Sequence, residues 1–534
     1  MTNELKAGPS SLPTGFRFVF GGFLAAALLL VWIPQYLPLT DYPEHLLVIQ
    51  VLSHYNDPGT QYVRDYAVKL GNVPYVSIYV LGMMLNRLLP IFAVGKVLLS
   101  LYIIFTPLSV LGYVRSIRNI SPWSSLLSFA FLFNLFYYLG SLNFLISIPL
   151  SFLALSLIVG LLHKPMDRTS SSNRSLTFSS QNWRPVTLAV VFIALFYTHF
   201  VSFAAVMLVA MGLGLAAKVR GQSIVSLAVS MVPSLALAGI SILKGLSASA
   251  PTLGASWLPL PSRLFDLLQP FLIYRDDYFH RTVVDKLSLP LLALAAGWFV
   301  ISLVSLIKGR FGSRSSLLEG ETGVHPDAWL VILIFLFSAL VFPSQIPSAS
   351  FAHRLSILVL LSFCGILPKQ FGGRTPTKGI LVAVTFFAFV VSGWRAADFN
   401  REMKPFLSAT KQMHADARVL PLIQNLHSTR LRTYCFLHIL NYYHLEKGGS
   451  NPYLLFRNMP QIPVHYRFLD ELPSVGSFEP DLFDWDMHHD RYRYFLARDA
   501  SARVMNQLRA HTRLIFESEG WSLYEAEDSL GGIH

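Results

Sequence analysis

The sequence predicts an all-α, multi-pass membrane domain that carries a small α/β domain at its C-terminal end. Of the 534 residues 53% are hydrophobic and only 13% are charged, whereas roughly a quarter are charged in soluble domains. The apolar residues gather in blocks of about 20, the length that crosses a hydrocarbon layer of about 30 Å. After residue 394 such blocks stop. A mean hydropathy of +0.49 excludes a soluble enzyme and a disordered scaffold.

The membrane domain is expected to cover residues 1–394. Its first apolar block, 16–34, follows a short polar start without an obvious small-residue cleavage site, so we expect an uncleaved first span and a first extracytoplasmic loop at 35–72. Further apolar blocks lie at residues 73–92, 93–114, 122–139, 143–162, 185–199, 200–217, 222–243, 286–307, 328–343, 353–368 and 379–394. Together they predict about 11–12 transmembrane or re-entrant helices.

Basic residues gather in alternate connections between these blocks: Arg115, Arg118, Lys164, Arg168, Arg174, Arg184, Lys218, Arg220, Lys308, Arg310, Arg314, Lys369, Arg374 and Lys378. The connections at 140–142, around His199 and at 343–352 carry none. Short basic connections face the cytoplasm, so residues 395–534 are expected on the opposite side. The net charge of +12 therefore indicates membrane orientation and not a nucleic-acid partner.

The block at 73–92 does not fit this count. Two full crossings between residues 73 and 114 would place Arg115 outside the cytoplasm. Pro74 and the Asn86-Arg87 pair interrupt the first of them, which favours a re-entrant or surface-lying helix.

The C-terminal residues, 395–534, are expected to form an extracytoplasmic α/β domain. Helical spacing of apolar residues predicts a helix at 429–445 that ends at Gly448-Gly449, and another helix at 502–510. Alternating apolar residues predict a strand at 492–496, and 513–517 with 521–526 predict a hairpin across Glu519-Gly520.

The strongest local signal for chemistry follows the first span. Asp41, Glu44 and His45 stand in the segment Thr-Asp-Tyr-Pro-Glu-His, and apolar residues on one side of the next eight predict a short helix along the membrane surface. A carboxylate at that position can act as a general base or bind a divalent cation. The alternative is a solvated acidic loop whose carboxylate faces the positive end of the helix dipole.

A second charged group lies at residues 275–281, where Asp276 and Asp277 supply adjacent carboxylates and His280 a metal ligand or an acid. The flanking Arg275 and Arg281 would hold a phosphate. The alternative is a turn whose charges pair with one another.

Single polar residues also stand at the non-cytoplasmic ends of the apolar blocks: Asn143, His199, His353 and Arg354. Ionisable groups at membrane depth are costly and usually face a cavity or a partner. Arg354 is suited to bidentate binding of a lipid phosphate, although an arginine at a helix end often reaches to the head-groups instead. His199 is a ligand or a structural histidine.

The arrangement of a first span, an acidic first loop with Asp41, many further spans and a C-terminal domain resembles the GT-C superfamily of integral-membrane glycosyltransferases. The resemblance implies that Asp41 is the catalytic or metal-coordinating carboxylate and that the donor is a sugar on a polyprenyl phosphate. The usual acidic pair of the superfamily is adjacent or one residue apart, whereas Asp41 and Glu44 are separated by two residues and followed by His45.

We therefore expect transfer of a hexose or pentose from a polyprenyl-phosphate donor to an extracytoplasmic saccharide, lipid or protein acceptor, in a bacterial inner membrane. The expected catalytic residues are Asp41, Glu44 and His45. The expected substrate-binding residues are His199, His353, Arg354, Asp276, Asp277 and His280, and a divalent cation, Mg²⁺ or Mn²⁺, could bind at Asp41. The alternative function is a non-catalytic transporter, flippase or assembly protein for lipid-linked saccharides. The sequence contains no phosphate-binding P-loop and no His-Glu-x-x-His zinc motif, so nothing in it supports an ATP-driven pump or a membrane protease.

Overall fold

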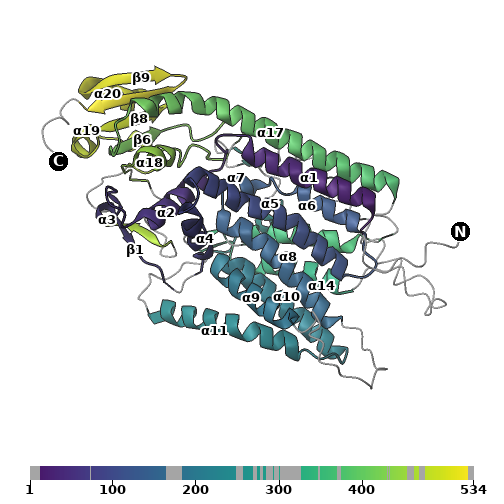
Figure 1. Ribbon diagram of the computed structural model, residues 1–534. Helices are drawn as coiled ribbons and strands as arrows, with labels where there is room; N and C mark the ends of the chain where they lie inside the picture. Colours follow the sequence, from purple (N-terminus) through teal and green to yellow (C-terminus); the bar gives the residue numbers. More distant parts are fainter. Residues whose placement is uncertain are drawn as a thin grey trace.

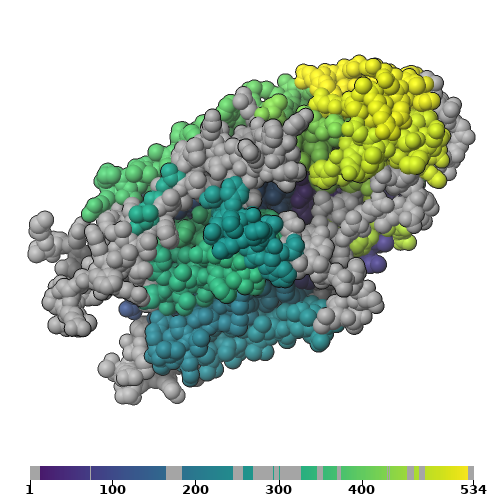
Figure 2. All heavy atoms as spheres, turned by 180° about the vertical axis from the view of Figure 1, so that it is seen from behind, coloured from purple at the N-terminus to yellow at the C-terminus, as the bar shows by residue number. Residues whose placement is uncertain are grey.

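A helical body and a C-terminal sheet domain are joined by one long helix (Figure 1). The computed structural model describes residues 12–71, 74–163, 183–247, 256–268, 274–276, 281–283, 326–346, 349–350, 352–367, 374–429, 433–450, 452–453, 462–467 and 475–526, with a few isolated positions. Seen from behind, the C-terminal domain (yellow) forms a lobe at one end of the body (Figure 2). Dark purple atoms from the N-terminal part of the chain are visible in a recess beside it.

Six helices among the described residues are long and apolar enough to cross a membrane, so the chain is a membrane protein. They are α1 (Thr14–Trp32), α5 (Ile91–Ser116), α8 (Leu142–Leu162), α10 (Phe200–Val219), α11 (Val225–Ser247) and α17 (Thr375–Gln412). Four shorter apolar segments lie among them: α4 (Ser77–Asn86), α9 (Arg184–Thr198), α14 (Pro326–Val341), and α15 (Leu355–Ser362) with the 3-10 turn η5 (Phe363–Ile366).

Apolar side chains on the outer surface of the body fit contact with lipid. Val225, Val229 and Val232 of α11 are each more than half exposed, which would be costly for a protein in water. The block predicted at 286–307 lies outside the described residues, apart from isolated positions.

The stretch at 73–92 contains only α4, whose ten residues rise about 15 Å, half the thickness of the hydrocarbon layer. Since α4 is too short to cross, α1 and α5 are successive crossings. Phe16 near the start of α1 packs edge-on against Trp123, which follows the end of α5 (5.5 Å between ring centroids). The basic Arg115 therefore lies at the end of the body where α1 begins, as the charge count requires.

The block at 122–139 forms no single spanning helix, contrary to the sequence interpretation. It folds into the turn η1 (Pro122–Leu126) and the short helices α6 (Leu127–Ala130) and α7 (Leu135–Tyr138). Asn134 lies between α6 and α7. Its side-chain oxygen accepts a hydrogen bond from the backbone N–H of Phe136 and so caps the start of α7. The segment is almost entirely buried, and irregular backbone at membrane depth is tolerated where protein surrounds it.

The end of the body opposite the first loop is fastened by a cluster of polar contacts around the buried Asp327. Asp327, at the start of α14, accepts two bonds from Arg220 after α10, at 3.0 and 3.2 Å. His163, after α8, lies 2.8 Å from the same carboxylate. This cluster ties three helix ends together on the basic side of the bundle.

The C-terminal domain is built on a four-stranded sheet in the order β6-β8-β10-β9, in which β6 is parallel to β8 and the other pairs are antiparallel. The strands are β6 (Val419–Ile423), β8 (Tyr494–Arg498), β9 (Thr512–Ser518) and β10 (Trp521–Ala526). With α20 (Ala502–His511) they match the predicted strand, helix and hairpin. The predicted helix at 429–445 is wrong before Asn441, because among the described residues of this range only those in α18 (Asn441–Lys447) are helical and non-helical turns precede them.

The remaining described elements are short: α2 (Tyr42–His54), α3 (Tyr62–Asp65), β1 (Tyr66–Val68), α12 (Leu260–Asp266), β2 (Tyr274–Asp276), β3 (Arg281–Val283), β4 (Gln345–Ile346), β5 (Ala349–Ser350), η4 (Ala352–Arg354), β7 (Val464–Tyr466), η8 (Pro480–Leu482), α19 (Trp485–His488) and η9 (His489–Arg491).

The sheet domain docks on the first loop. Strand β7 pairs antiparallel with β1 of that loop, and Tyr66 stacks on Tyr466. Helix α17 runs through the boundary expected at residues 394–395 and, at 38 residues, reaches about 57 Å. The Lys447 ammonium donates to the carbonyls of Thr410 and Met413 at the end of α17 (2.9 and 2.8 Å). A lysine that caps the last carbonyls stabilises a helix end, so α17 and α18 hold the domain against the loop.

Candidate functional site

Asp41 stands at the N-terminal end of α2, yet its side chain makes no capping hydrogen bond. Pro43 in the first turn has the fixed backbone angle that suits a helix start. The Asp41 side chain is 27% exposed, so its carboxylate remains open to a substrate.

The backbone of Asp41 is held by the turn before α8. Its N–H donates to the carbonyl of Leu139, and Thr40 N–H donates to Tyr138, both at 3.0 Å. Gly140 in that turn has a φ of +72°, and a Cβ there would lie 2.8 Å from Tyr42 N and 3.0 Å from Asp41 N. Only glycine permits this approach.

Helix α2 differs from the surface helix predicted for it. Leu46, Leu47, Val48 and Ile49 are all buried, because α4 and α5 pack against it on one side and α18 on another. A helix apolar on most sides is typical of a buried position. The first loop is therefore enclosed by protein.

The Glu44 side chain is directed to the C-terminal domain. Glu44 is 1% exposed, and its Oε2 lies 3.2 Å from Nε2 of His438. The same nitrogen lies 3.8 Å from Asp41 Oδ1. Sequence reasoning gave His438 no role, because its spacing in the chain contains no information about this contact.

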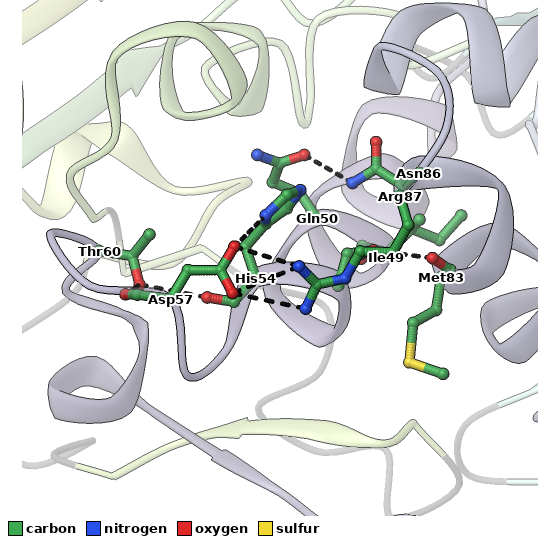
Figure 3. A network of polar contacts seen from close by, with 9 residues as sticks. Ile49, Gln50, His54, Asp57, Thr60, Met83, Asn86 and Arg87 are labelled. Atoms are coloured by element: carbon green, nitrogen blue, oxygen red, sulfur yellow. Dashed lines mark hydrogen bonds and ion pairs between the residues drawn. The ribbon is translucent and has the colours of Figure 1, made fainter.

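His45 contacts Tyr79 of α4, with 2.9 Å between Nδ1 and the phenol oxygen. The position of α4 is fixed by a polar network at the far end of α2 (Figure 3). There, Arg87 donates to both Asp57 oxygens at 3.3 Å, and Asp57 lies 2.6 Å from His54 Nδ1. This network aligns α4 with α2 and so keeps Tyr79 beside His45.

Arg354 and His199 meet at the same end of the bundle. Arg354 Nη1 lies 2.9 Å from His199 Nε2. Because a guanidinium only donates, Nε2 accepts. Nδ1 lies 3.1 Å from Ser202 Oγ and 3.3 Å from Ser202 N at the start of α10. His199 is fully buried, and Tyr75 packs edge-on against its ring (5.1 Å between centroids).

His353 stacks on Phe136 (5.9 Å between centroids, 7° between planes). The guanidinium of Arg354 lies over the ring of Phe144 at 5.9 Å. These aromatic faces fix both side chains at the start of α15. Arg354 therefore points into the protein instead of reaching to the head-groups.

The field of Arg354 reaches the first loop. Burial raises the pKa of Asp41 to about 7, and the positive charge of Arg354 opposes that increase. Burial and Arg354 lower the pKa of His45 to about 4, so His45 is neutral near pH 7. The structure thus brings together Asp41, Glu44, His45, His199, His353 and Arg354; their chemical roles stay a prediction.

The second predicted group, at residues 275–281, lies mostly outside the described residues. Asp277 and His280 lie outside the described residues. For Asp276 the structure describes the backbone alone, in β2 opposite Arg281 of β3.

The divalent cation expected at Asp41 needs several oxygen ligands. Among the described residues, no group of three or more His, Cys, Asp or Glu side chains is arranged to hold a metal ion. Glu44, the nearest carboxylate in sequence, faces His438. A divalent cation at Asp41 stays a prediction.

No protein-family model and no curated protein matches the sequence. The fold, however, matches a solved structure of ArnT from Cupriavidus metallidurans bound to undecaprenyl phosphate, with a TM-score of 0.52. The match covers 98% of this chain and 100% of that chain at 9% identity. Since ArnT is a GT-C glycosyltransferase, the chain has the GT-C fold, as the resemblance implied.

We predict that Gly140→Ala displaces Asp41 and lowers stability by about 1–3 kcal/mol, because it adds a clash to an unfavourable φ. Gly221→Ala is the matched control, with a φ of +74° and open space around the added Cβ. Thermal unfolding in lipid nanodiscs measures both. Equal destabilisation of the two variants would contradict the close approach at Gly140.

Proposed function

We propose that this GT-C fold is a membrane glycosyltransferase that transfers a sugar from a polyprenyl-phosphate-linked donor to an acceptor hydroxyl. The observation that carries the proposal is the pairing of a carboxyl whose pKa lies near 7 with a partly buried arginine at the same end of the bundle. A general base works best when its pKa is close to the operating pH. The bound undecaprenyl phosphate of ArnT supports a lipid phosphate as the donor's carrier.

In the proposed reaction the Asp41 carboxylate removes the proton of the acceptor hydroxyl. The hydroxyl oxygen then forms a bond to the anomeric carbon of the sugar, and the bond between that carbon and the phosphate oxygen breaks. The electron pair of the broken bond remains on the polyprenyl phosphate. Arg354 stabilises the developing charge, which a positioned cation does strongly in a site of low polarity.

The neighbouring residues have supporting roles in this scheme. His199 accepts from Arg354 and directs the guanidinium, and His353 closes the site on the other side by its stack on Phe136. Neutral His45 offers a hydrogen bond without adding a second positive charge near Asp41. Glu44 sets the start of α2 through His438.

We expect Asp41→Asn to reduce sugar transfer by about 10²–10⁴-fold, since the amide cannot accept the proton, and to leave the protein folded. Glu44→Gln should reduce transfer less. Asp65→Asn is the control, a carboxylate of the same loop that is bound to Arg64, and its rate of transfer should stay near that of the wild type.

The measurement is turnover of undecaprenyl-phosphate-linked hexoses and pentoses by the purified protein in lipid. Full activity of Asp41→Asn would place the base elsewhere, for example at Asp276 or Asp277. Binding of the donors by the wild-type protein without any turnover would favour the transport alternative.

The rate should rise with pH through about 7 and level off above it, because Asp41 must be ionised to act as a base. Arg354 lowers the pKa of Asp41, so Arg354→Gln should move this rise to higher pH and also increase the KM of the donor. Arg354→Lys, which keeps the charge, should move it less. A rise that stays at the same pH in Arg354→Gln would show that Asp41 is not the titrating group.

We also propose that the site and the C-terminal domain face away from the cytoplasm, in a bacterial inner membrane. The basic residues at the C-terminal ends of α5 and α10, Arg220 among them, lie opposite the site. This agrees with the positive-inside rule. A reporter that is active only in the cytoplasm should stay silent when fused after His534 and should be active when inserted at residues 169–182. The reverse pattern would overturn the orientation.

A further inference from the structure

His438 belongs to the C-terminal domain but reaches the catalytic carboxylates of the first loop. Its Nε2 is 3.2 Å from Glu44 and 3.8 Å from Asp41, and its side chain is 5% exposed in a fully protein-lined position. We propose that His438 is a positioning residue of the site, which holds Glu44 and thereby the start of α2, so that docking of the C-terminal domain completes the catalytic centre. This inference rests on the proposed transferase function.

The chemistry of the contact supports such a role. A buried carboxylate is costly unless donors satisfy it, and Glu44 has 1% of its surface exposed. Burial, with a smaller contribution from His45, lowers the pKa of His438 to about 3, so the ring is neutral. The neutral ring lies against the Glu44 carboxylate, with 3.2 Å between Nε2 and Oε2, and adds no charge that would lower the pKa of Asp41.

The segment around His438 is fixed on the first loop by independent contacts. Three residues earlier, Cys435 lies 3.6 Å from the carbonyl of Pro38. Four residues later, Tyr442 packs edge-on against Tyr36, with 5.0 Å between ring centroids. Figure 1 shows α18 beside α2. Residues before and after His438 in the sequence therefore hold it against the first loop.

This geometry favours a positioning role for His438 and not a role in proton transfer. Asp41 and Glu44 are three residues apart at the start of one helix, so a shift of Glu44 moves Asp41 with it. A misplacement of about 1 Å in a catalytic group can cost about 10²-fold in rate. The effect should appear in kcat, because neither donor nor acceptor contacts His438 in the proposed scheme.

The test compares His438→Leu, which removes the polar contact with Glu44, with His438→Gln, which keeps a neutral polar side chain at this position. We expect His438→Leu to lower kcat by about 10²-fold with little change in the donor's KM, and His438→Gln to recover part of the loss. His444→Leu is the matched control, because His444 is also buried in the same segment but bonds to the carbonyl of Gly448; its kcat should stay near that of the wild type.

A second measurement does not depend on turnover. In a double-mutant cycle of Glu44→Gln and His438→Gln, the shifts in unfolding temperature should be non-additive, as for residues in direct contact. Additive shifts, or unchanged kcat in both His438 variants of an active protein, would overturn the inference alone. Absence of turnover by the wild-type protein with every undecaprenyl-phosphate sugar would overturn the proposed function and the catalytic part of this inference together.

Discussion

The contact between Arg354 and His199 is the interaction on which the candidate site depends. It joins the start of α15 to the junction of α9 and α10 and directs a cation toward the first loop. Within the described part of the chain, no carboxylate lies within ion-pair distance of Arg354, so its hydrogen-bond partner there is a neutral ring. A guanidinium held in this way keeps its charge available for an anion, because the geometry is fixed without neutralising it.

The helices place the polar groups of the candidate site at one end of the bundle. Asp327, Arg220 and His163 close the opposite end with their own ion cluster, so charges occur at the two ends while the middle of the bundle is apolar. The irregular segment from η1 to α7 is accommodated because it is buried. Its last turn, at Gly140, supplies the carbonyl groups on which the backbone of Thr40 and Asp41 rests.

The sequence predicted that these polar groups meet at one end of the bundle, because polar residues at membrane depth are rare and therefore informative. Five polar residues stand at or near ends of apolar blocks, on the side without basic residues: Asp41, His45, His199, His353 and Arg354. Because successive spans cross the membrane in opposite directions, these ends lie on the same side. The same reasoning fails for His438, because a contact between the tail and the first loop depends on docking and not on local spacing. It also fails for residues 122–139, because apolar composition cannot distinguish a lipid-facing span from short buried helices. For α2 it predicted a helix on the membrane surface, whereas α4 and α18 bury this helix.

The electrostatic balance between Asp41 and Arg354 explains why both groups can serve one reaction. A direct ion pair would hold the Asp41 pKa low and weaken it as a base, and it would also occupy the cation needed at the phosphate. The desolvation of Asp41 outweighs the attraction of Arg354, since the pKa of Asp41 is raised and not lowered. Fold similarity at 9% identity does not decide function, which depends on site residues. In the proposed reaction, this balance would let Asp41 take up a proton near pH 7 while Arg354, bound to His199, keeps its charge for the phosphate.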